Sequence, residues 1–466
     1  MTDDVQIPAS EVGEFLDIEA LREWIERQRW YASKSRRVAA IELAAGVVLS
    51  EGPMLLLALV RAIFATGQHE LYQLPLGLRR AGEASEQEAI AMTEGWSVYD
   101  ALADPEHARE LVRRIAAPEE VDTGEGCLRF WRADGTVAVP DDAVVRPIGL
   151  EQSNTSLVFG TELVLKVFRK LEPGINPELE MLRFLTAREF PNIAPLHGWF
   201  DYDGRSFAAT LGVAQKFLPD ANDGWALALE QIAADPEGFL GLLGSLGTAT
   251  AAMHSVLASD TTDVAFIPEE PSNEAMSLLT ATIDEEIERI FVRLPDDERL
   301  APIAGRGQDV RERLAARSQL GVGGRVIRIH GDYHLGQTLY TPRGWVIIDF
   351  EGEPARPLSE RRQKRSPLRD VASMLRSFAY VTSALEILHG KAAPEHFEQR
   401  ARETFLEHYF DDVELTLLPS GEAAVANLLS IFELEKAIYE LQYELDNRPD
   451  WVAIPVAGIM RMLESP

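Results

Sequence analysis

The distribution of apolar and polar residues changes from strand-like to helix-like along the chain. Short apolar runs bounded by turn residues predict strands over 38–49, 54–64, 71–78, 163–168, 198–202 and 207–211. After about residue 220, apolar residues recur at helical spacing, which predicts helices over 239–257, 274–293, 309–320, 367–385 and 422–445. The pattern predicts an α+β, bilobal protein with a strand-rich N-terminal lobe and a helical C-terminal lobe.

Interruptions of this pattern predict domain boundaries. Segment 81–88 is small and polar, and Pro219 ends the last predicted strand region. A chain of 466 residues is also too long for one hydrophobic core. We therefore expect an N-terminal cap over residues 1–92, an intermediate part over 93–219 that completes the N-lobe, and a helical C-lobe over 220–466. The cap is interpreted as a structural or docking module.

One stretch, residues 325–353, places acidic residues after two short apolar runs. The first run leads into His330-Gly331-Asp332, and Gln337 follows five residues after the aspartate. The second run ends at Asp349. This pair of acidic positions, with an amide between them, is the most informative pattern in the chain.

Phosphoryl transfer from Mg-ATP matches this arrangement. It needs one carboxylate that orients or deprotonates the attacking hydroxyl, and another that holds the metal ions bridging the phosphates. We predict Asp332 as the catalytic base, Asp349 as the main Mg²⁺ ligand and Gln337 as an auxiliary ligand. The alternative is that both aspartates are turn and strand-end residues of an acidic protein.

A lysine inside the predicted strand 163–168 indicates a second part of the site. Lys166 is costly to place in an apolar strand unless its charge is paired or used. The following helix, which starts after Asn176, carries Glu178 and Glu180 in its first turn. Kinases pair a phosphate-contacting lysine with a helix glutamate, and we predict Glu180 for this role with Glu178 in reserve. Alternatively, both glutamates only complement the helix dipole.

Three further features have local interpretations. The polar turn Ser153-Asn154-Thr155 is predicted to offer backbone N–H groups to the ATP phosphates. His254 is interpreted as a satisfied core or helix-end histidine. The basic run 356–369, in so acidic a chain, could help to bind phosphate, but a solvated loop is the favoured interpretation.

The last predicted helix carries a candidate sugar site. Lys436, Tyr439, Glu440 and Tyr443 are spaced so that they share one helix face. Together they could hydrogen-bond to sugar hydroxyls and offer aromatic rings to the sugar's C–H groups. The alternative is a pair of interior tyrosines beside a surface ion pair.

Composition restricts the partners. The formal net charge of −30, from 45 basic and 75 acidic residues, disfavours nucleic acid and anionic membranes as partners. It also favours a neutral or cationic co-substrate over an anionic one. The N-terminus lacks the features of a signal peptide, and no apolar run reaches the length of a membrane span. A single cysteine, Cys127, excludes an intramolecular disulfide, so a cytoplasmic location is expected.

With these pieces in place, the chain resembles the bacterial maltokinases, which belong to the aminoglycoside-phosphotransferase-like branch of the eukaryotic-type kinase fold. The resemblance rests on the H-G-D-x-H-x-x-Q loop, the D-F-E-G-E-P run, the S-P-L-R-D-V-A-x-M-L-R-S-F segment and the stretch 432–455, and extends over almost the whole chain. Within the cap, Tyr31 and Ala32-Ser33 depart from the expected Phe and Ala-Gly.

This resemblance implies ATP-dependent phosphorylation of maltose at its anomeric hydroxyl, giving maltose 1-phosphate for α-glucan synthesis. It implies ATP and Mg²⁺ as cofactors, and many members are linked to trehalose synthase. By motif it assigns the same roles to the residues named above for catalysis, metal binding and phosphate contact. It assigns the sugar site to Lys436, Tyr439 and Tyr443, and helical geometry adds Glu440.

Two alternatives remain open. Related cap-bearing kinases act on glucosamine and more distant relatives on aminoglycosides, although Lys436 would repel an amine. The other alternative is a pseudokinase that docks to trehalose synthase without turnover, but such a protein has no need of Lys166, Asp332 and Asp349 together.

Overall fold

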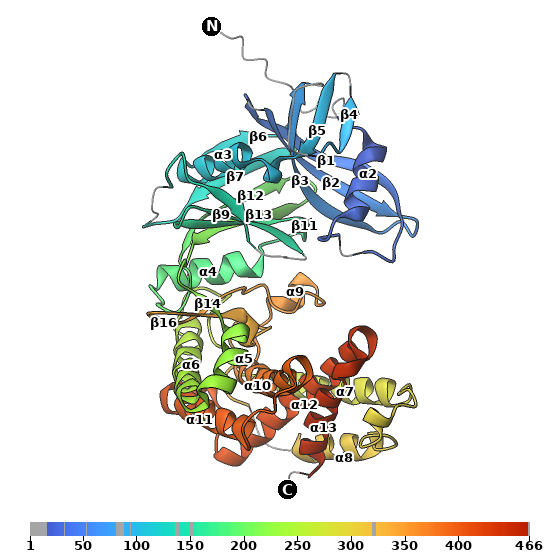
Figure 1. Cartoon of the computed structure of the whole chain (residues 1–466), viewed down its shortest axis with the longest axis vertical. Coiled ribbons are helices and arrows are strands. Elements are labelled where there is room, and N and C mark those ends of the chain that lie inside the picture. The colour runs from blue at the N-terminus through green and yellow to red at the C-terminus, as the bar shows by residue number, and fades with distance from the viewer. Residues whose placement is uncertain are drawn as a thin grey trace. The chain divides into compact units, whose positions relative to one another are not determined.

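The computed structural model describes residues 16–31, 33–52, 54–80, 88–93, 95–135, 139–148, 153–318 and 323–464. The chain forms two compact units (Figure 1). The first consists of Met1–Arg183 and Ala194–Pro219, and the second of Phe184–Ile193 and Asp220–Pro466. The first is rich in strands and the second in helices, so the α+β prediction is confirmed. The first unit ends at Pro219.

The N-terminal part of the first unit forms an antiparallel sheet, six-stranded within the described residues. Its order is β1 (Val38–Glu51), β2 (Met54–Phe64), β3 (His69–Arg80), β5 (Trp96–Asp100) and β4 (Ala91–Thr93), with β11 (Lys170–Leu171) paired to β3. Helix α2 (Ile18–Arg27) buries Leu21 and Ile25 in the core of this sheet. Because β4 pairs with β5, the predicted cap boundary near residue 92 falls inside the sheet, which extends to Asp100.

A second sheet, of seven strands over the residues described, completes the first unit. Its order is β6 (Glu120–Asp122), β7 (Gly126–Arg132), β12 (Leu196–Gly204), β13 (Ala208–Lys216), β10 (Leu163–Phe168), β9 (Asn154–Phe159) and β8 (Val145–Pro147). Helix α3 (Pro105–Ala116) packs on it, and α4 (Pro177–Ala187) follows β11. The buried Gln73 on β3 joins the two sheets, because its side-chain amide donates to the carbonyls of Phe168 and Leu211 at 3.0 and 2.8 Å.

Within the described residues, the second unit consists of helices and one small sheet. The helices are α5 (Gly224–Ala234), α6 (Pro236–Leu257), α7 (Asn273–Phe291), α8 (Gly307–Arg317), α9 (Leu358–Arg361), α10 (Leu368–His389), α11 (Phe397–Asp412), α12 (Glu422–Asn447) and α13 (Ala453–Glu464). The sheet contains β14 (Asn222–Asp223), β15 (Thr338–Thr341) and β16 (Gly344–Ile347). Short 3₁₀ turns lie at Ala101–Ala103 in the first unit and at Glu298–Leu300, Leu335–Gln337, Leu415–Leu417 and Pro449–Trp451 in the second.

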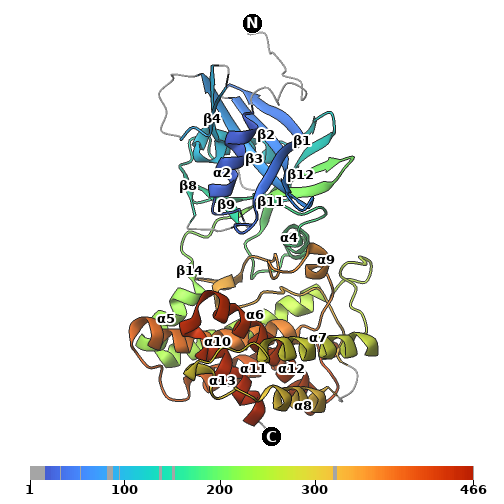
Figure 2. The same ribbon diagram turned by 90° about the vertical axis from the view of Figure 1, so that its right-hand side faces the viewer.

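Two helical layers carry the core of the second unit. Helices α6 and α11 pack together, and α10 packs on α12. Buried residues of α7, α8, α12 and α13 form one apolar cluster, and Figure 2 shows these four helices close to one another. Helices α6 and α10 are long and apolar enough to span a membrane by length and composition, but 61% of each apolar window is buried inside the protein, as in core helices.

Candidate active site

A buried carboxylate holds the backbone of the predicted catalytic loop. Asp370, on the first turn of α10 and 1% exposed, accepts hydrogen bonds from the backbone N–H groups of His330 at 2.8 Å and Gly331 at 2.9 Å. His254 Nε2 lies 3.2 Å from the same carboxylate. Burial alone would raise the pKa of Asp370, but these hydrogen bonds lower it, so the carboxylate is ionised. His254 is fully buried and bonded on both nitrogens, as expected of a core histidine.

His330 joins the loop to the end of β16. Its Nε2 lies 2.9 Å from the carbonyl oxygen of Ile348, which can only accept, so Nε2 carries the proton. Its Nδ1 then accepts from the backbone N–H of Asp332 at 3.3 Å. Gly331, between His330 and Asp332, has φ 86°, a left-handed conformation that glycine adopts without strain. The two hydrogen bonds of the imidazole and the sharp turn therefore fix the backbone at Asp332 and at Ile348, the residue before Asp349.

The side chain of Asp332 faces a lysine from α12. Lys436 Nζ lies 3.5 Å from Asp332 Oδ1 and 2.9 Å from Glu353 Oε1. Burial opposes charge on Lys436, but Glu353 and Asp332 outweigh it and raise the lysine pKa above its ordinary value. Burial likewise opposes charge on Glu353, but Lys436 and Arg356 lower its pKa to about 2. The predicted base thus lies beside an ammonium that remains protonated at neutral pH.

Asp349 and Gln337 lie together in the second unit. The Gln337 side-chain amide donates to Asp349 Oδ2 at 3.0 Å, and the Gln337 carbonyl accepts from the N–H of Ile348 at 3.0 Å. Asp349 has φ 63°, a left-handed conformation that is uncommon for a non-glycine residue and clusters at functional sites. A carboxylate and an amide oxygen are the hard ligands that Mg²⁺ prefers, so this pair fits a magnesium ion.

The strand lysine of the first unit is paired, but with the reserve glutamate. Lys166 Nζ on β10 donates to Glu178 Oε2 at 2.8 Å. Glu178 is 2% exposed and lies on the same face of α4 as Met181 and Leu182, which are also buried. Glu180, two positions later, lies on a different face of the helix and is only partly buried. The predicted pairing of Lys166 with Glu180 is therefore corrected to Glu178, because helical phase turns Glu178 toward the sheet.

The predicted phosphate-binding turn is mostly strand where the structure describes it. Asn154 and Thr155 are the first residues of β9 and pair with Phe168 and Val167 of β10. Ser153 precedes the strand and is exposed. The hydroxyl of Thr155 accepts a hydrogen bond from Arg169 Nε at 2.9 Å. These residues lie beside the lysine strand, but Asn154 and Thr155 are not part of an open polar turn.

The predicted sugar-binding face of α12 divides into two parts. Tyr439 and Tyr443 are 39% and 44% exposed, and the Lys436 ammonium lies 5.2 Å from the Tyr439 ring centroid. These positions contradict the alternative of interior tyrosines beside a surface ion pair. Glu440 differs, because it is 9% exposed and accepts from Arg376 Nε and Nη2 at 3.0 and 2.7 Å. Glu440 is therefore a buried structural anion, and its predicted place in the sugar site is corrected.

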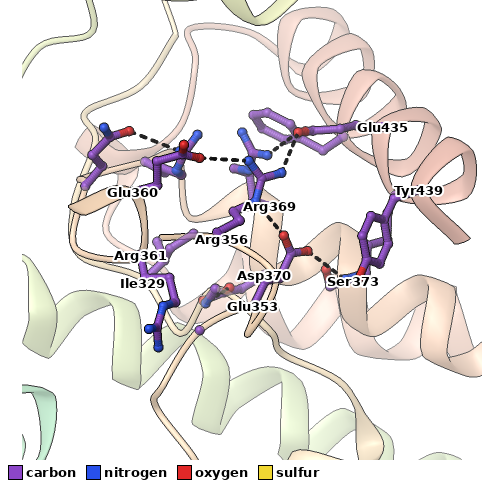
Figure 3. Close-up of a pocket in the computed structure, with 16 residues that line it drawn as sticks. Ile329, Glu353, Arg356, Glu360, Arg361, Arg369, Asp370, Ser373, Glu435 and Tyr439 are labelled. Atoms are coloured by element: carbon purple, nitrogen blue, oxygen red, sulfur yellow. Dashed lines mark hydrogen bonds and ion pairs between the residues drawn. The ribbon is translucent and has the colours of Figure 1, made fainter. Parts of the chain in front are cut away.

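A pocket lies next to Lys436 (Figure 3). Glu353 is placed between Arg356, at 2.6 Å, and Lys436. Glu435 on α12 accepts from Arg369 and lies 3.7 Å from Arg356. Sequence reasoning missed the two glutamates. The D-F-E-G-E run gave the only signal for Glu353, since it follows Asp349 closely. The basic run was interpreted as a solvated loop, but its members Arg356, Arg361, Arg365 and Arg369 line this pocket.

The chain matches two family models and several known proteins in sequence. Residues 24–104 match the maltokinase N-terminal cap domain, and residues 144–378 match the phosphotransferase enzyme family. A glucosamine kinase from Streptacidiphilus jiangxiensis is 26% identical over 437 residues, which cover 84% of this chain and 95% of the relative. A glucosamine kinase from Mycolicibacterium smegmatis is 28% identical over 335 residues, covering 68% and 79%.

Solved structures show the same fold. A glucosamine kinase in complex with glucosamine, ADP and inorganic phosphate matches with a TM-score of 0.70 at 21% identity, and covers 95% of this chain and 99% of that chain. The strand-rich unit with its cap and the helical unit thus form the kinase-like fold of that group. The family match spans half of the chain and includes the loop of Asp332 and Asp349. The chain belongs to the phosphotransferase enzyme family and carries the N-terminal cap domain of maltokinases.

Proposed function

We propose that the protein is an ATP-dependent sugar kinase that phosphorylates maltose at its anomeric hydroxyl, giving maltose 1-phosphate. The observation that carries the proposal is the contact between Asp332 and Lys436, 3.5 Å apart, beside the exposed ring of Tyr439. This contact supports the proposal because a carboxylate, a cationic hydrogen-bond donor and an aromatic ring lie next to one another. A sugar hydroxyl needs these groups to be bound and deprotonated.

The geometry of each unit supports the phosphoryl-transfer roles. Asp332 orients the acceptor hydroxyl and takes its proton. Asp349 and Gln337 would hold Mg²⁺, which would offset negative charge on the phosphates. Lys166, kept in position by Glu178, contacts the phosphates of ATP. Asn154 and Thr155, at the start of β9, pair with the strand that carries Lys166, and Ser153 precedes them in the chain.

The charge on Lys436 supports a neutral acceptor. Glu353 and Asp332 raise its pKa, so a cation stands beside the catalytic base at neutral pH. An amine of the acceptor placed here would be repelled by a few kcal/mol at most, because the surrounding carboxylates screen the lysine. Tyr439 and Tyr443 offer ring faces to the C–H groups of a disaccharide.

Glucosamine is the second candidate acceptor. The relatives described above are named glucosamine kinases, and one was solved with glucosamine bound. The pocket beside Lys436 also contains Glu353 and Glu435, which could attract an amine. The two acceptors differ in charge, so a direct comparison distinguishes them.

The test is ADP release from Mg-ATP with maltose, glucose, glucosamine and an aminoglycoside as separate acceptors. Strong turnover with maltose alone, giving an acid-labile phosphate ester, would support the proposal. Preference for glucosamine would keep the role of Asp332 and overturn the acceptor. ATP binding without turnover on any sugar would favour a docking protein, for example one that associates with trehalose synthase. Asp332→Asn should abolish turnover, while Asp296→Asn, at an exposed position, is the matched control.

A further inference from the structure

The pocket next to Lys436 gathers the arginines of the basic run in one place. Arg356, Arg361, Arg365 and Arg369 line it together with Gln363, and the same lining includes Lys436 and Tyr439. All of these residues belong to the second unit. In a chain with a net charge of −30, such a concentration of guanidinium groups needs a physical reason.

Most of the positive charge in the pocket is matched by carboxylates. Arg356 pairs with Glu353 at 2.6 Å and with Glu360 at 3.3 Å. Arg369 pairs with Glu435. Figure 3 shows these ion pairs as a connected network on one side of the pocket.

Arg365 differs from Arg356 and Arg369. Its Nη2 donates to the neutral side-chain oxygen of Gln363 at 3.0 Å, and no carboxylate of the described residues lies within ion-pair distance of it. Burial, followed by the charges of Arg369 and Arg356, lowers its pKa to about 10, although Glu435 and Glu360 act in the opposite direction. A partly buried guanidinium with two cationic neighbours is unfavourable by itself, and a bound anion would relieve it.

We propose that Arg365 is the anchor of an anion site that binds the phosphate group of a phosphorylated sugar. The sugar end of such a ligand would lie toward Lys436 and Tyr439, which line the same pocket, and would compete with the acceptor. A guanidinium offers the planar pair of N–H donors that phosphate oxygens accept. The sugar part of this inference rests on the proposed function, whereas the anion site depends only on the pocket. The consequence is inhibition of the kinase by sugar phosphates such as its own product.

The experiment is calorimetric titration of the full chain, saturated with ADP so that the nucleotide site is filled, with inorganic phosphate and with glucose 1-phosphate. Arg365→Gln should weaken binding of both probes at least tenfold, and Arg365→Lys should restore part of the affinity. Arg343→Gln, at an exposed turn of the same unit, should leave both unchanged. Thermal unfolding of each variant checks that the fold is intact. Glucose 1-phosphate should bind several-fold more tightly than inorganic phosphate, and a saturating acceptor sugar should displace it.

Equal affinities of the Arg365→Gln variant and the parent chain for phosphate would overturn the anion site. Equal affinities of the two probes, or no displacement by sugar, would overturn its assignment to sugar phosphates. These measurements need no turnover, so they are independent of the proposed function. Arg365-dependent phosphate binding in a protein that phosphorylates no sugar would refute the proposed function and keep the anion site.

Discussion

Lys436 on α12 places its ammonium 3.5 Å from the carboxylate of Asp332, although the two residues are more than a hundred positions apart in the chain. Glu353 holds the lysine at 2.9 Å, and Arg356 in turn holds Glu353. The predicted catalytic base is therefore part of a charge network that reaches from the catalytic loop to the C-terminal helix. Under the proposed function, each member of this network would affect how an acceptor approaches Asp332.

Replacing Lys436 by methionine tests whether its charge selects the acceptor. The variant should lose roughly 10²-fold in kcat/KM for a neutral sugar, because it removes a charged hydrogen-bond donor worth about 2–3 kcal/mol. It should lose much less with glucosamine, since the repelling charge is gone. Initial rates with both sugars measure this ratio, and the KM for ATP should stay unchanged. Lys391→Met, at an exposed position, is the control. Equal losses with the two sugars would remove the charge argument.

Asp370→Asn tests how the catalytic loop is positioned. The change keeps the shape of the side chain but replaces one accepting oxygen by a donor. This donor faces the N–H group of Gly331 at the Oδ1 position, or the N–H group of His330 together with His254 at the Oδ2 position. Such a mismatch in a buried site costs about 1–3 kcal/mol, and the loop should lose its fixed geometry. We expect kcat to fall by roughly 10²-fold and the melting temperature to drop by several degrees. A variant with normal kcat and lowered stability would show that Asp370 only supports the core.

The sequence predicted the fold class and pointed to the segment that carries Asp332 and Asp349, because both depend on local patterns. Runs of apolar residues determine strands and helices, and the spacing of Asp332 and Asp349 is visible in a single segment. The partner of Lys166 was misassigned because Glu178 and Glu180 differ by two positions in one helical turn, and this distinction depends on which helix face packs on the sheet.

Contacts between segments distant in the chain could not be predicted from local sequence patterns. Helical spacing placed Glu440 on the same face as Lys436, but it could not show that Glu440 forms a buried ion pair with Arg376 of α10. In the same way, the hydrogen bonds from the backbone of His330 to Asp370 depend on how α10 packs against the predicted catalytic loop. Arg365 belongs to a basic run whose arginines cannot be told apart from the sequence. In the structure Arg356 and Arg369 pair with glutamates, whereas Arg365 donates to the neutral Gln363.

Glu178 and Glu180 provide a matched pair of variants for the first unit. Glu178→Gln should raise the KM for ATP and lower kcat, together by about tenfold or more in kcat/KM, because it removes the charged partner of a lysine whose side chain is 12% exposed. Glu180→Gln should have a smaller effect. Kinetics at varied Mg-ATP and constant sugar compare the two. A larger defect in the Glu180 variant would restore the original assignment and contradict the role inferred from the 2.8 Å contact.

The stability of the second unit should depend on the ionisation of Glu353. Lys436 and Arg356 lower the pKa of this buried carboxyl to about 2, whereas glutamate in an unfolded chain has a pKa of about 4.3. A carboxyl with a lowered folded-state pKa stabilises the folded state above its unfolded pKa, and the contribution is lost as the pH falls through the folded pKa. The full contribution is of order 3 kcal/mol, and about half of it should disappear between pH 7 and pH 3.

Glu353→Gln should therefore be clearly less stable than the parent chain at pH 7, and the difference should shrink at pH 3. Hydrogen exchange of the α12 amides, measured by mass spectrometry, reports on opening of the second unit, and unfolding of the first unit does not contribute to this signal. Glu407→Gln, an exposed glutamate on α11, is the control and should show no pH-dependent difference. A difference between Glu353→Gln and the parent chain that stays constant from pH 7 to pH 3 would mean that Glu353 acts through packing and not through its charge. In that case Lys436 would depend mainly on Asp332 for its counter-charge.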